Sequence, residues 1–249
     1  DGDNRTDFIL GDSSSKEFFI IKNTSEMWTS YPKNFNFDDI IKIDMETDLP
    51  YRKRPFQVLM LDVDNDGVTD ILKVGKDEIF MVRGDRNRLF ITSGKAMNPS
   101  LFSQPQGFSI GPNPTIIHGH LNKDHFPDLV VINETGKGWI LINKGGKGFT
   151  VFFVLNLSTA PFIKLADFNG DRLDDIVAYG GGYSGIKILL NNGEGFFTKP
   201  IEWSVDGMAV RSLAVHDINR DGLSDIILTV YNPHRGLEGR VLMNISQRL

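Results

Sequence analysis

The chain has 249 residues, 40% of them hydrophobic and 24% charged, and a formal net charge of −5. This composition is typical of a globular protein with a buried core, and the mild acidity argues against a general nucleic-acid binder. The sequence has no cysteine, which excludes disulfides and thiolate chemistry, and no run approaches the ~18 consecutive apolar residues of a membrane helix.

Short apolar segments recur along the chain on either side of acidic loops. In chain order, the segments before the loops are 56–61, 115–118, 162–166 and 210–215, and those after them are 71–74, 129–132, 176–178 and 226–230. A third series follows across a turn at 78–82, 138–142, 186–190 and 239–243, and a fourth closes most units, as at 89–92 and 196–199. All are rich in Ile, Val and Phe and separated by Gly, Asn and Asp, as is typical of strands. No window shows sustained helical periodicity.

Four strands per unit, repeated without helices, predict an all-β fold: a β-propeller built of four-stranded antiparallel blades. The acidic loops lie at 1–7, 62–70, 120–128, 167–175 and 217–225, and their final aspartates are 47 to 63 residues apart. Propeller blades take about 40–50 residues, and insertions around 37–51 and 96–112 account for the two longer steps. We expect residues 1–249 to form a single propeller region of about three complete and two partial blades, because the first loop starts inside its motif.

The complete loops share the pattern Asp-x-Asp/Asn-x-Asp-x-x-x-Asp, with an apolar residue at position 7. Calcium takes six to eight oxygen ligands, and side chains at positions 1, 3, 5 and 9 converge on one point with the carbonyl at position 7. Without a cation such carboxylates repel one another, and the lack of nitrogen and sulfur ligands argues against zinc or copper. Three Ca2+ sites are predicted, with the ligands Asp62, Asp64, Asp66, Val68 and Asp70; Asp167, Asn169, Asp171, Leu173 and Asp175; and Asp217, Asn219, Asp221, Leu223 and Asp225.

Two other interpretations of these loops are weaker. An EF-hand needs a glutamate at position 12 and flanking helices, but position 12 is Lys73, Ala178 or Leu228. A metal-free turn rich in Asp, Asn and Gly explains neither the apolar residue nor the final aspartate at fixed offsets. Calcium therefore remains the prediction.

The loop at 120–128 departs from the pattern, because His120 replaces the first ligand and His125 replaces the turn glycine. Its remaining ligands are Asn122, Asp124, the Phe126 carbonyl and Asp128. A fourth Ca2+ site and a metal-free loop both stay open here. The loop at 1–7 lacks its first ligand altogether.

These loops resemble those of the FG-GAP/VCBS repeat family of calcium-binding propellers, which includes the head of integrin α subunits. The segments 189–196 and 142–149 also resemble the usual third-strand ending of that family. The resemblance implies calcium ligands at positions 1, 3, 5, 7 and 9 of a loop between the first and second strands of each blade. Family propellers usually have seven blades, so it also implies a partial ring. Phe-Gly and Gly-Ala-Pro tripeptides are not evident, which places the chain nearer the VCBS side and leaves integrin-type ligand binding aside.

Other candidate chemistry is less specific. His118, His120 and His216 suit loop or packing positions better than a zinc site. Trp28, Trp139 and Trp203 can stack on sugars, but at strand positions they more often pack a blade. Five Asn-x-Ser/Thr sequons favour a glycosylated extracellular protein. They begin at Asn4, Asn23, Asn133, Asn156 and Asn244.

The resulting hypothesis is a non-enzymatic, calcium-stabilised propeller module, secreted or part of a cell-surface ectodomain. It would mediate adhesion by binding a protein or glycan ligand, or other domains or subunits of a larger assembly, without nucleic acid and without inserting into the membrane. Two alternatives remain: the propeller scaffold of a lyase-like enzyme acting on polysaccharides, and a structural spacer in a larger surface protein.

Overall fold

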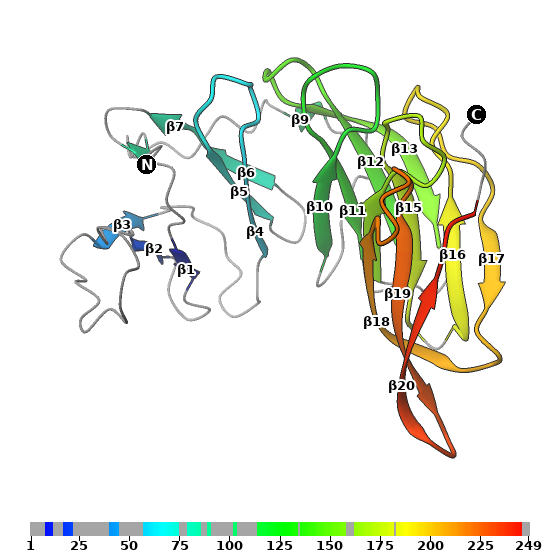
Figure 1. Ribbon diagram of the computed structural model, residues 1–249. Coiled ribbons are helices and arrows are strands. Elements are labelled where there is room, and N and C mark those ends of the chain that lie inside the picture. The colour runs from blue at the N-terminus through cyan, green and yellow to red at the C-terminus, as the bar shows by residue number, and fades with distance from the viewer. Residues whose placement is uncertain are drawn as a thin grey trace. The chain divides into compact units, whose positions relative to one another are not determined.

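The computed structural model describes residues 8–11, 17–21, 40–44, 57–74, 79–85, 89–90, 102–103, 114–133, 135–157, 162–181 and 183–245. Within these residues every regular element is a β-strand, which confirms the predicted all-β class (Figure 1). The chain divides into two compact units. The first comprises residues 1–62, 66–75 and 79–99, and the second comprises residues 63–65, 76–78 and 100–249.

The described strands of the first unit form antiparallel sheets. One has the order β1 (Phe8–Gly11), β2 (Glu17–Ile21), β3 (Ile40–Asp44), and another has the order β4 (Gln57–Leu61), β5 (Asp70–Val74), β6 (Ile79–Val82). Two short strands, β7 (Gly84–Asp85) and β8 (Leu89–Phe90), pair with each other. The segment 89–92, predicted to close a blade, thus contributes β8 to a two-stranded sheet instead.

The second unit contains three larger sheets. The first has the order β10 (Thr115–Gly119), β11 (Asp128–Ile132), β12 (Lys137–Asn143), β13 (Phe149–Asn156), with the short β9 (Phe102–Ser103) parallel to β13. The second is β14 (Phe162–Ala166), β15 (Asp175–Tyr179), β16 (Gly185–Leu189), β17 (Ile201–Ser204). The third is β18 (Ala209–His216), β19 (Asp225–Asn232), β20 (Gly236–Leu242).

The fourth strand of the second sheet begins later than the sequence predicts. Residues 196–199 were expected to form it, but β17 starts at Ile201. The preceding residues instead fold back in a tight loop, in which the N–H of Thr198 donates to the carbonyl of Leu190. Pro200 then separates this loop from β17, since proline has no N–H to offer a strand ladder.

The second strand of each sheet explains the uninterrupted apolar runs in the sequence. All five residues of β15 are buried, because neighbouring sheets cover both of its faces. Ile176 and Ala178 belong to the apolar core that contains Val130 and Ile132 of β11 and Ile140 of β12. Val177 and Tyr179, which alternate with them, belong to the core shared with β18 and β19.

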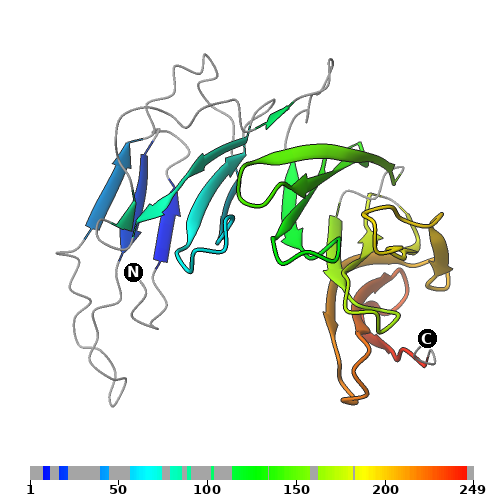
Figure 2. The ribbon, with the colours of Figure 1, turned by 90° about the horizontal axis from the view of Figure 1, so that it is seen from above.

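The sheets of the second unit are stacked face to face in chain order (Figures 1 and 2). Their first strands lie next to one another, β10 beside β14 and β14 beside β18. Mainly antiparallel sheets of three to five strands, stacked in this way, are arranged as the blades of a β-propeller. The predicted four-stranded antiparallel blade is found unchanged in β14–β17. The predicted fold class is therefore confirmed.

Candidate metal loops

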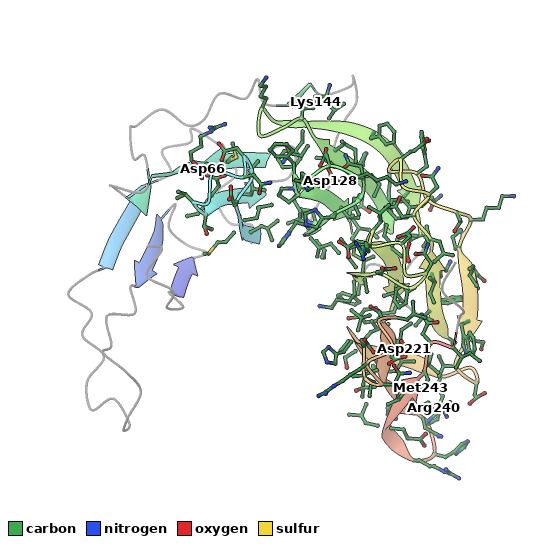
Figure 3. The ribbon with its side chains drawn as sticks, turned by 45° about the horizontal axis from the view of Figure 1, so that its top comes forward. Asp66, Asp128, Lys144, Asp221, Arg240 and Met243 are labelled. Carbon is green, nitrogen blue, oxygen red and sulfur yellow. The ribbon has the colours of Figure 1, made fainter. Side chains whose placement is uncertain are left out.

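Each acidic loop joins the first strand of a sheet to the second. Loop 62–70 joins β4 to β5, loop 120–128 joins β10 to β11, loop 167–175 joins β14 to β15, and loop 217–225 joins β18 to β19. Figure 3 labels Asp66, Asp128 and Asp221, which lie in three of these loops. The predicted position of the loops between first and second strands is thus correct for all four.

The first aspartate organises the backbone of each complete loop. The carboxylate of Asp62 accepts the N–H groups of Asp66 and Gly67, at 3.1 and 2.8 Å. Asp217 accepts the equivalent pair from Asp221 and Gly222, at the same distances. Asp167 accepts N–H groups from positions 4 and 6 of its own loop, at 2.6 and 2.8 Å. One carboxylate therefore holds the turn closed.

Closing the turn requires left-handed backbone at positions 4 and 6. The residues concerned are Asn65 and Gly67, Gly170 and Arg172, and Arg220 and Gly222, with φ between 60° and 84°. Glycine adopts this conformation without strain, and asparagine tolerates it better than most residues. Loop 120–128 has no residue with positive φ, because its first position is His120 and no carboxylate gathers the turn.

The third and fifth positions are tied to each other and to position 7. In loop 217–225 the N–H of Leu223 donates to Asp221 Oδ1 at 2.8 Å, and Asn219 Nδ2 donates to Asp221 Oδ2 at 2.9 Å. Loop 167–175 makes the same two bonds at 2.9 and 3.1 Å. Loop 120–128 repeats them as well, at 2.9 and 3.0 Å. This half of the loop is thus common to all three.

Loop 62–70 brings three carboxylates together. Oxygen atoms of Asp62, Asp64 and Asp70 all lie within 4.8 Å of one another, a spacing at which they can hold a metal ion. It is the only such group of acidic or histidine side chains among the described residues. Gly146 lies directly against Asp64, and a Cβ at that position would collide with it. The loop is therefore closely packed around its carboxylates.

The final aspartate of each loop is buried. Its exposure is 3% for Asp70 and 0% for Asp128, Asp175 and Asp225. Asp175 accepts the N–H of Phe168 at 2.9 Å and the N–H of Asn191 at 2.7 Å. Asp128 and Asp225 each accept the corresponding two N–H groups, at distances of 2.7 to 3.1 Å. The final aspartate therefore fastens the loop to the end of the third strand.

Burial changes the acidity of these carboxyl groups. It raises the pKa of Asp128 and of Asp175 to about 6, although backbone hydrogen bonds oppose the shift. The pKa of Asp225 moves down instead, because the N–H groups of Asn244 and Ile218 stabilise its charge. Asp225 is also inaccessible to solvent, but desolvation raises its pKa less than these two hydrogen bonds lower it. A bound cation favours the ionised form of all three.

The family match falls on two of the complete loops. Residues 167–228, which include loops 167–175 and 217–225, match the family described as FG-GAP-like repeat. This segment is an FG-GAP-like repeat. The resemblance to FG-GAP repeats inferred from the loop motif is confirmed for this segment, whereas the placement nearer the VCBS side stays a prediction. A search of curated proteins finds no match to the sequence.

One solved structure shares the propeller fold with this chain, and others align with it less closely. An Agrocybe aegerita lectin with specific recognition of non-reducing terminal N-acetylglucosamine is 16% identical, with a TM-score of 0.64 over 98% of this chain and 64% of the lectin. The Photorhabdus luminescens Tc holotoxin pore (14%, TM-score 0.46) aligns over 98% of this chain and 13% of its own. BBS1N, solved with ARL6DN, is 14% identical at a TM-score of 0.45 over 76% of this chain and 57% of its own. At these identities only the fold follows, and the lectin alone supports it.

The third strands of the blades supply residues that the ligand motif does not include. An asparagine follows or ends the third apolar segment at Asn143, Asn191 and Asn244, and its backbone N–H binds the final aspartate of the loop. The signal in the sequence is that an asparagine recurs at the same place in each unit. The motif places its ligands in the loop, so this contribution from the third strand was not predicted.

Successive loops are also linked by hydrogen bonds between backbone groups. The N–H of Asp174 donates to the carbonyl of His120 at 2.9 Å, and the N–H of Ser224 donates to the carbonyl of Asp167 at 3.1 Å. Both donors are at position 8 of their loops. Position 8 of loop 120–128 is Pro127, which has no N–H and cannot form this bond.

The tryptophan and histidine candidates differ in their exposure to solvent. Trp139 is 3% exposed, so it packs the blade, whereas Trp203 on β17 is 56% exposed. His118, His120 and His216 are exposed and, among the described residues, form no three-ligand group. Trp28 and loop 1–7 lie outside the described residues. No helix in the described parts of the chain is long and apolar enough to cross a membrane.

Proposed function

We propose that this chain is a calcium-stabilised propeller module that binds a protein or glycan ligand outside the cell and is not itself an enzyme. The observation that carries the proposal is the group formed by Asp62, Asp64 and Asp70, whose oxygen atoms lie within 4.8 Å of one another. Carboxylates this close repel one another unless a cation neutralises them. An all-oxygen ligand set of this kind suits calcium.

The loops differ in the charge they offer an ion. Loop 62–70 has four aspartates at the ligand positions, whereas Asn169 and Asn219 replace the third-position aspartate in the other two complete loops. Calcium affinity rises with ligand charge and site rigidity, so we expect loop 62–70 to bind calcium most tightly. Val68, Leu173 and Leu223 would each supply a backbone carbonyl.

The surroundings of the final aspartates favour a structural ion over a catalytic one. Each of Asp128, Asp175 and Asp225 is inaccessible to solvent, and two backbone N–H groups fix each carboxylate. A carboxylate held in this way orders the start of the second strand and is poorly placed to leave a coordination position open for a substrate. The ion would attract ligands from both the start and the end of the loop and so hold the two ends together.

The metal proposal is tested by melting and titration. Thermal unfolding is measured in excess Ca2+ and in EDTA, and calcium binding is measured by isothermal titration calorimetry. Ligand-stabilised folding predicts a higher melting temperature with calcium, by RT ln(1 + [Ca2+]/Kd) in free energy. Asp62→Ala should lose the tightest site, while a variant of an exposed residue outside the loops, Glu202→Gln, should keep it. An unchanged melting temperature and no heat of binding would refute the proposal.

The glycan part of the proposal has two supports. The lectin that shares this fold recognises terminal N-acetylglucosamine, and Trp203 offers an exposed aromatic ring on which a sugar can stack. A glycan array and a co-purification screen test glycan and protein ligands side by side. Trp203→Ala should weaken a glycan hit, and Ile201→Ala, two residues away on the same strand and 52% exposed, should not. Finding no ligand in either screen would favour a spacer.

The sequons bear on the extracellular part of the proposal. Asn133 is 8% exposed, and its Oδ1 accepts hydrogen bonds from Thr135 and Lys137. Asn244 donates its side-chain N–H groups to backbone carbonyls, which an attached glycan would disrupt. Asn156 is exposed at the end of β13, beside the exposed Val154. Among the described sequons, Asn156 is therefore the one suited to carry a glycan.

A further inference from the structure

The final aspartates of successive loops belong to one continuous chain of hydrogen bonds. Starting from the last loop, Asp225 Oδ1 accepts the backbone N–H of Asn244 at 2.7 Å. The side chain of Asn244 then donates from Nδ2 to the carbonyl of Phe168 at 2.8 Å. Phe168 in turn donates its own N–H to Asp175 Oδ2 at 2.9 Å. One asparagine and one loop residue thus connect Asp225 to Asp175.

The next step repeats the same arrangement one blade earlier. Asp175 Oδ1 accepts the N–H of Asn191 at 2.7 Å, and Asn191 Nδ2 donates to the carbonyl of Leu121 at 2.8 Å. Leu121 donates its N–H to Asp128 Oδ2 at 3.1 Å. The chain of bonds therefore enters Asp175 through one carboxylate oxygen and leaves through the other.

A third copy continues from Asp128. Its Oδ1 accepts the N–H of Asn143 at 2.8 Å, and Asn143 Nδ2 donates to the carbonyl of Val63 at 2.8 Å. Each asparagine also donates to the carbonyl at position 8 of its own loop: Pro127 for Asn143, Asp174 for Asn191 and Ser224 for Asn244. The same asparagine hydrogen bonds, with similar distances, thus occur in three successive blades.

The chain of bonds is buried where it crosses between blades at Asn143 and Asn191, and partly buried where it crosses at Asn244. Leu121 is 0% exposed and Phe168 is 6% exposed, and their side chains lie in the apolar cores on either side of the β14–β17 sheet. Hydrogen bonds to a carboxylate are stronger than neutral ones, and low local dielectric strengthens them further. Displacing one final aspartate therefore disturbs the loop before it.

We propose that Asn143, Asn191 and Asn244 are positioning residues that couple neighbouring loops, so that an ion in one loop favours an ion in the next. This inference rests on the proposed calcium binding. An ion fixes the final aspartate of its loop, and the asparagine transmits that order to position 2 of the preceding loop. Binding of the second ion then costs less conformational entropy, because the preceding loop is already partly ordered. The result is positive coupling without a large change of shape.

The sign of the effect separates this mechanism from direct electrostatics. Two cations in neighbouring loops repel each other through space, so electrostatics alone predicts that filling one loop weakens binding in the next. The hydrogen-bond chain predicts the opposite. The two complete loops 167–175 and 217–225, linked through Asn244, provide the cleanest pair for a test.

The experiment uses the full chain and hydrogen–deuterium exchange, which follows each loop separately as Ca2+ is added. Asp221→Ala removes a ligand from loop 217–225. We expect it to raise the calcium concentration that half-protects loop 167–175 by about fivefold or more, the scale of ordinary coupling. In the Asn244→Ala background this shift should disappear. Asn232→Ala is the matched control, since Asn232 bonds Glu238 and His234 at the other end of β19 and β20.

The possible outcomes are distinct. If neither loop 167–175 nor loop 217–225 of the wild-type chain gains protection with calcium, the coupling is refuted, and if loop 62–70 gains none either, the proposed function fails as well. If both gain protection but Asp221→Ala causes no shift, shifts loop 167–175 to lower calcium, or causes the same shift with and without the Asn244 amide, the coupling is refuted. Should Asn244→Ala fail to fold by circular dichroism, Asn244→Gln, which displaces the amide by one methylene, is compared in its place.

Discussion

Loops 167–175 and 120–128 share a framework and differ in their ligands. In both, the final aspartate is 0% exposed and accepts one N–H from position 2 and one from the third-strand asparagine. Only loop 167–175 has a carboxylate at position 1, and only its turn contains left-handed residues. The carbonyl of His120 still accepts the N–H of Asp174 from the next blade, but the imidazole side chain of His120 offers no oxygen ligand.

The difference indicates that the first and the final aspartate of the motif have different structural roles. The final aspartate and the third-strand asparagine join strands within a blade and between blades, whether or not the ligand set is complete. The aspartate at position 1 closes the turn around the position where an ion would lie. Loss of the first ligand can therefore be tolerated by the fold, whereas loss of the last should not be.

The largest effect should follow from removing a final aspartate in EDTA. Asp175→Ala and Asp128→Ala each leave two buried N–H groups without an acceptor, at about 1–3 kcal/mol each, so each variant should lower the free energy of unfolding by about 2–6 kcal/mol. Urea denaturation measures this. Asp171→Ala, at an exposed position, is the control and should cost less than about 1 kcal/mol without calcium. If Asp128→Ala lowered the free energy of unfolding no more than Asp171→Ala does, the two loops would not share a framework.

Restoring a carboxylate at position 1 should make the calcium affinity of loop 120–128 more like that of loop 167–175. His120→Asp adds a carboxylate at position 1 of loop 120–128, and we expect a gain in calcium affinity of about tenfold or more, equivalent to 1.4 kcal/mol. Exchange protection of this loop as a function of calcium measures the change. His216→Asp, which lies just before loop 217–225, controls for added negative charge. If His120→Asp gains nothing, the backbone of the turn is the limiting factor.

Calcium binding in loop 167–175 should weaken as the pH falls through about 6. The pKa of Asp175 is about 6 in the metal-free fold, so below that pH calcium competes with a proton, and affinity should fall by up to about tenfold per pH unit. Loop 217–225, whose Asp225 has a lowered pKa, should keep its affinity to lower pH. Titrations of the two loops at pH 7 and pH 5 compare them.

The metal-free protein should respond to pH in the opposite sense. The folded-state pKa values of Asp128 and Asp175 lie above the ordinary value of 3.8, so the folded form binds more protons between about pH 4 and 6. The free energy of unfolding in EDTA should accordingly rise as the pH falls across that window. A fall would mean that these carboxylates are less buried in solution.

The smallest effect concerns the sequons. In a secretory eukaryotic host Asn156→Gln should remove one glycan, seen as a loss of mass sensitive to glycosidase, and change stability by no more than about 0.5 kcal/mol. Asn244→Gln should leave the glycan content unchanged and lower stability instead, because Asn244 binds two backbone carbonyls. A glycan found at Asn244 in the folded protein would contradict this assignment.

Local patterns explain why much of the fold could be predicted. Alternating apolar segments and Gly/Asn turns indicate strands over a few residues, and the spacing of Asp167, Asp171 and Asp175 indicates a loop that can hold a cation. The errors lie where local pattern is ambiguous. Residues 196–199 resemble a strand, but a bond from Thr198 to Leu190 closes a loop there and β17 begins later.

By itself the sequence determined the fold class and the position of the oxygen-rich loops between strands, because each depends on residues close together in the chain. Only the tertiary structure decided which carboxylates meet, how burial changes their pKa, and what Asn143, Asn191 and Asn244 do. Their contacts join residues 70 to 80 positions apart, and such contacts exist only once one blade is stacked on the next.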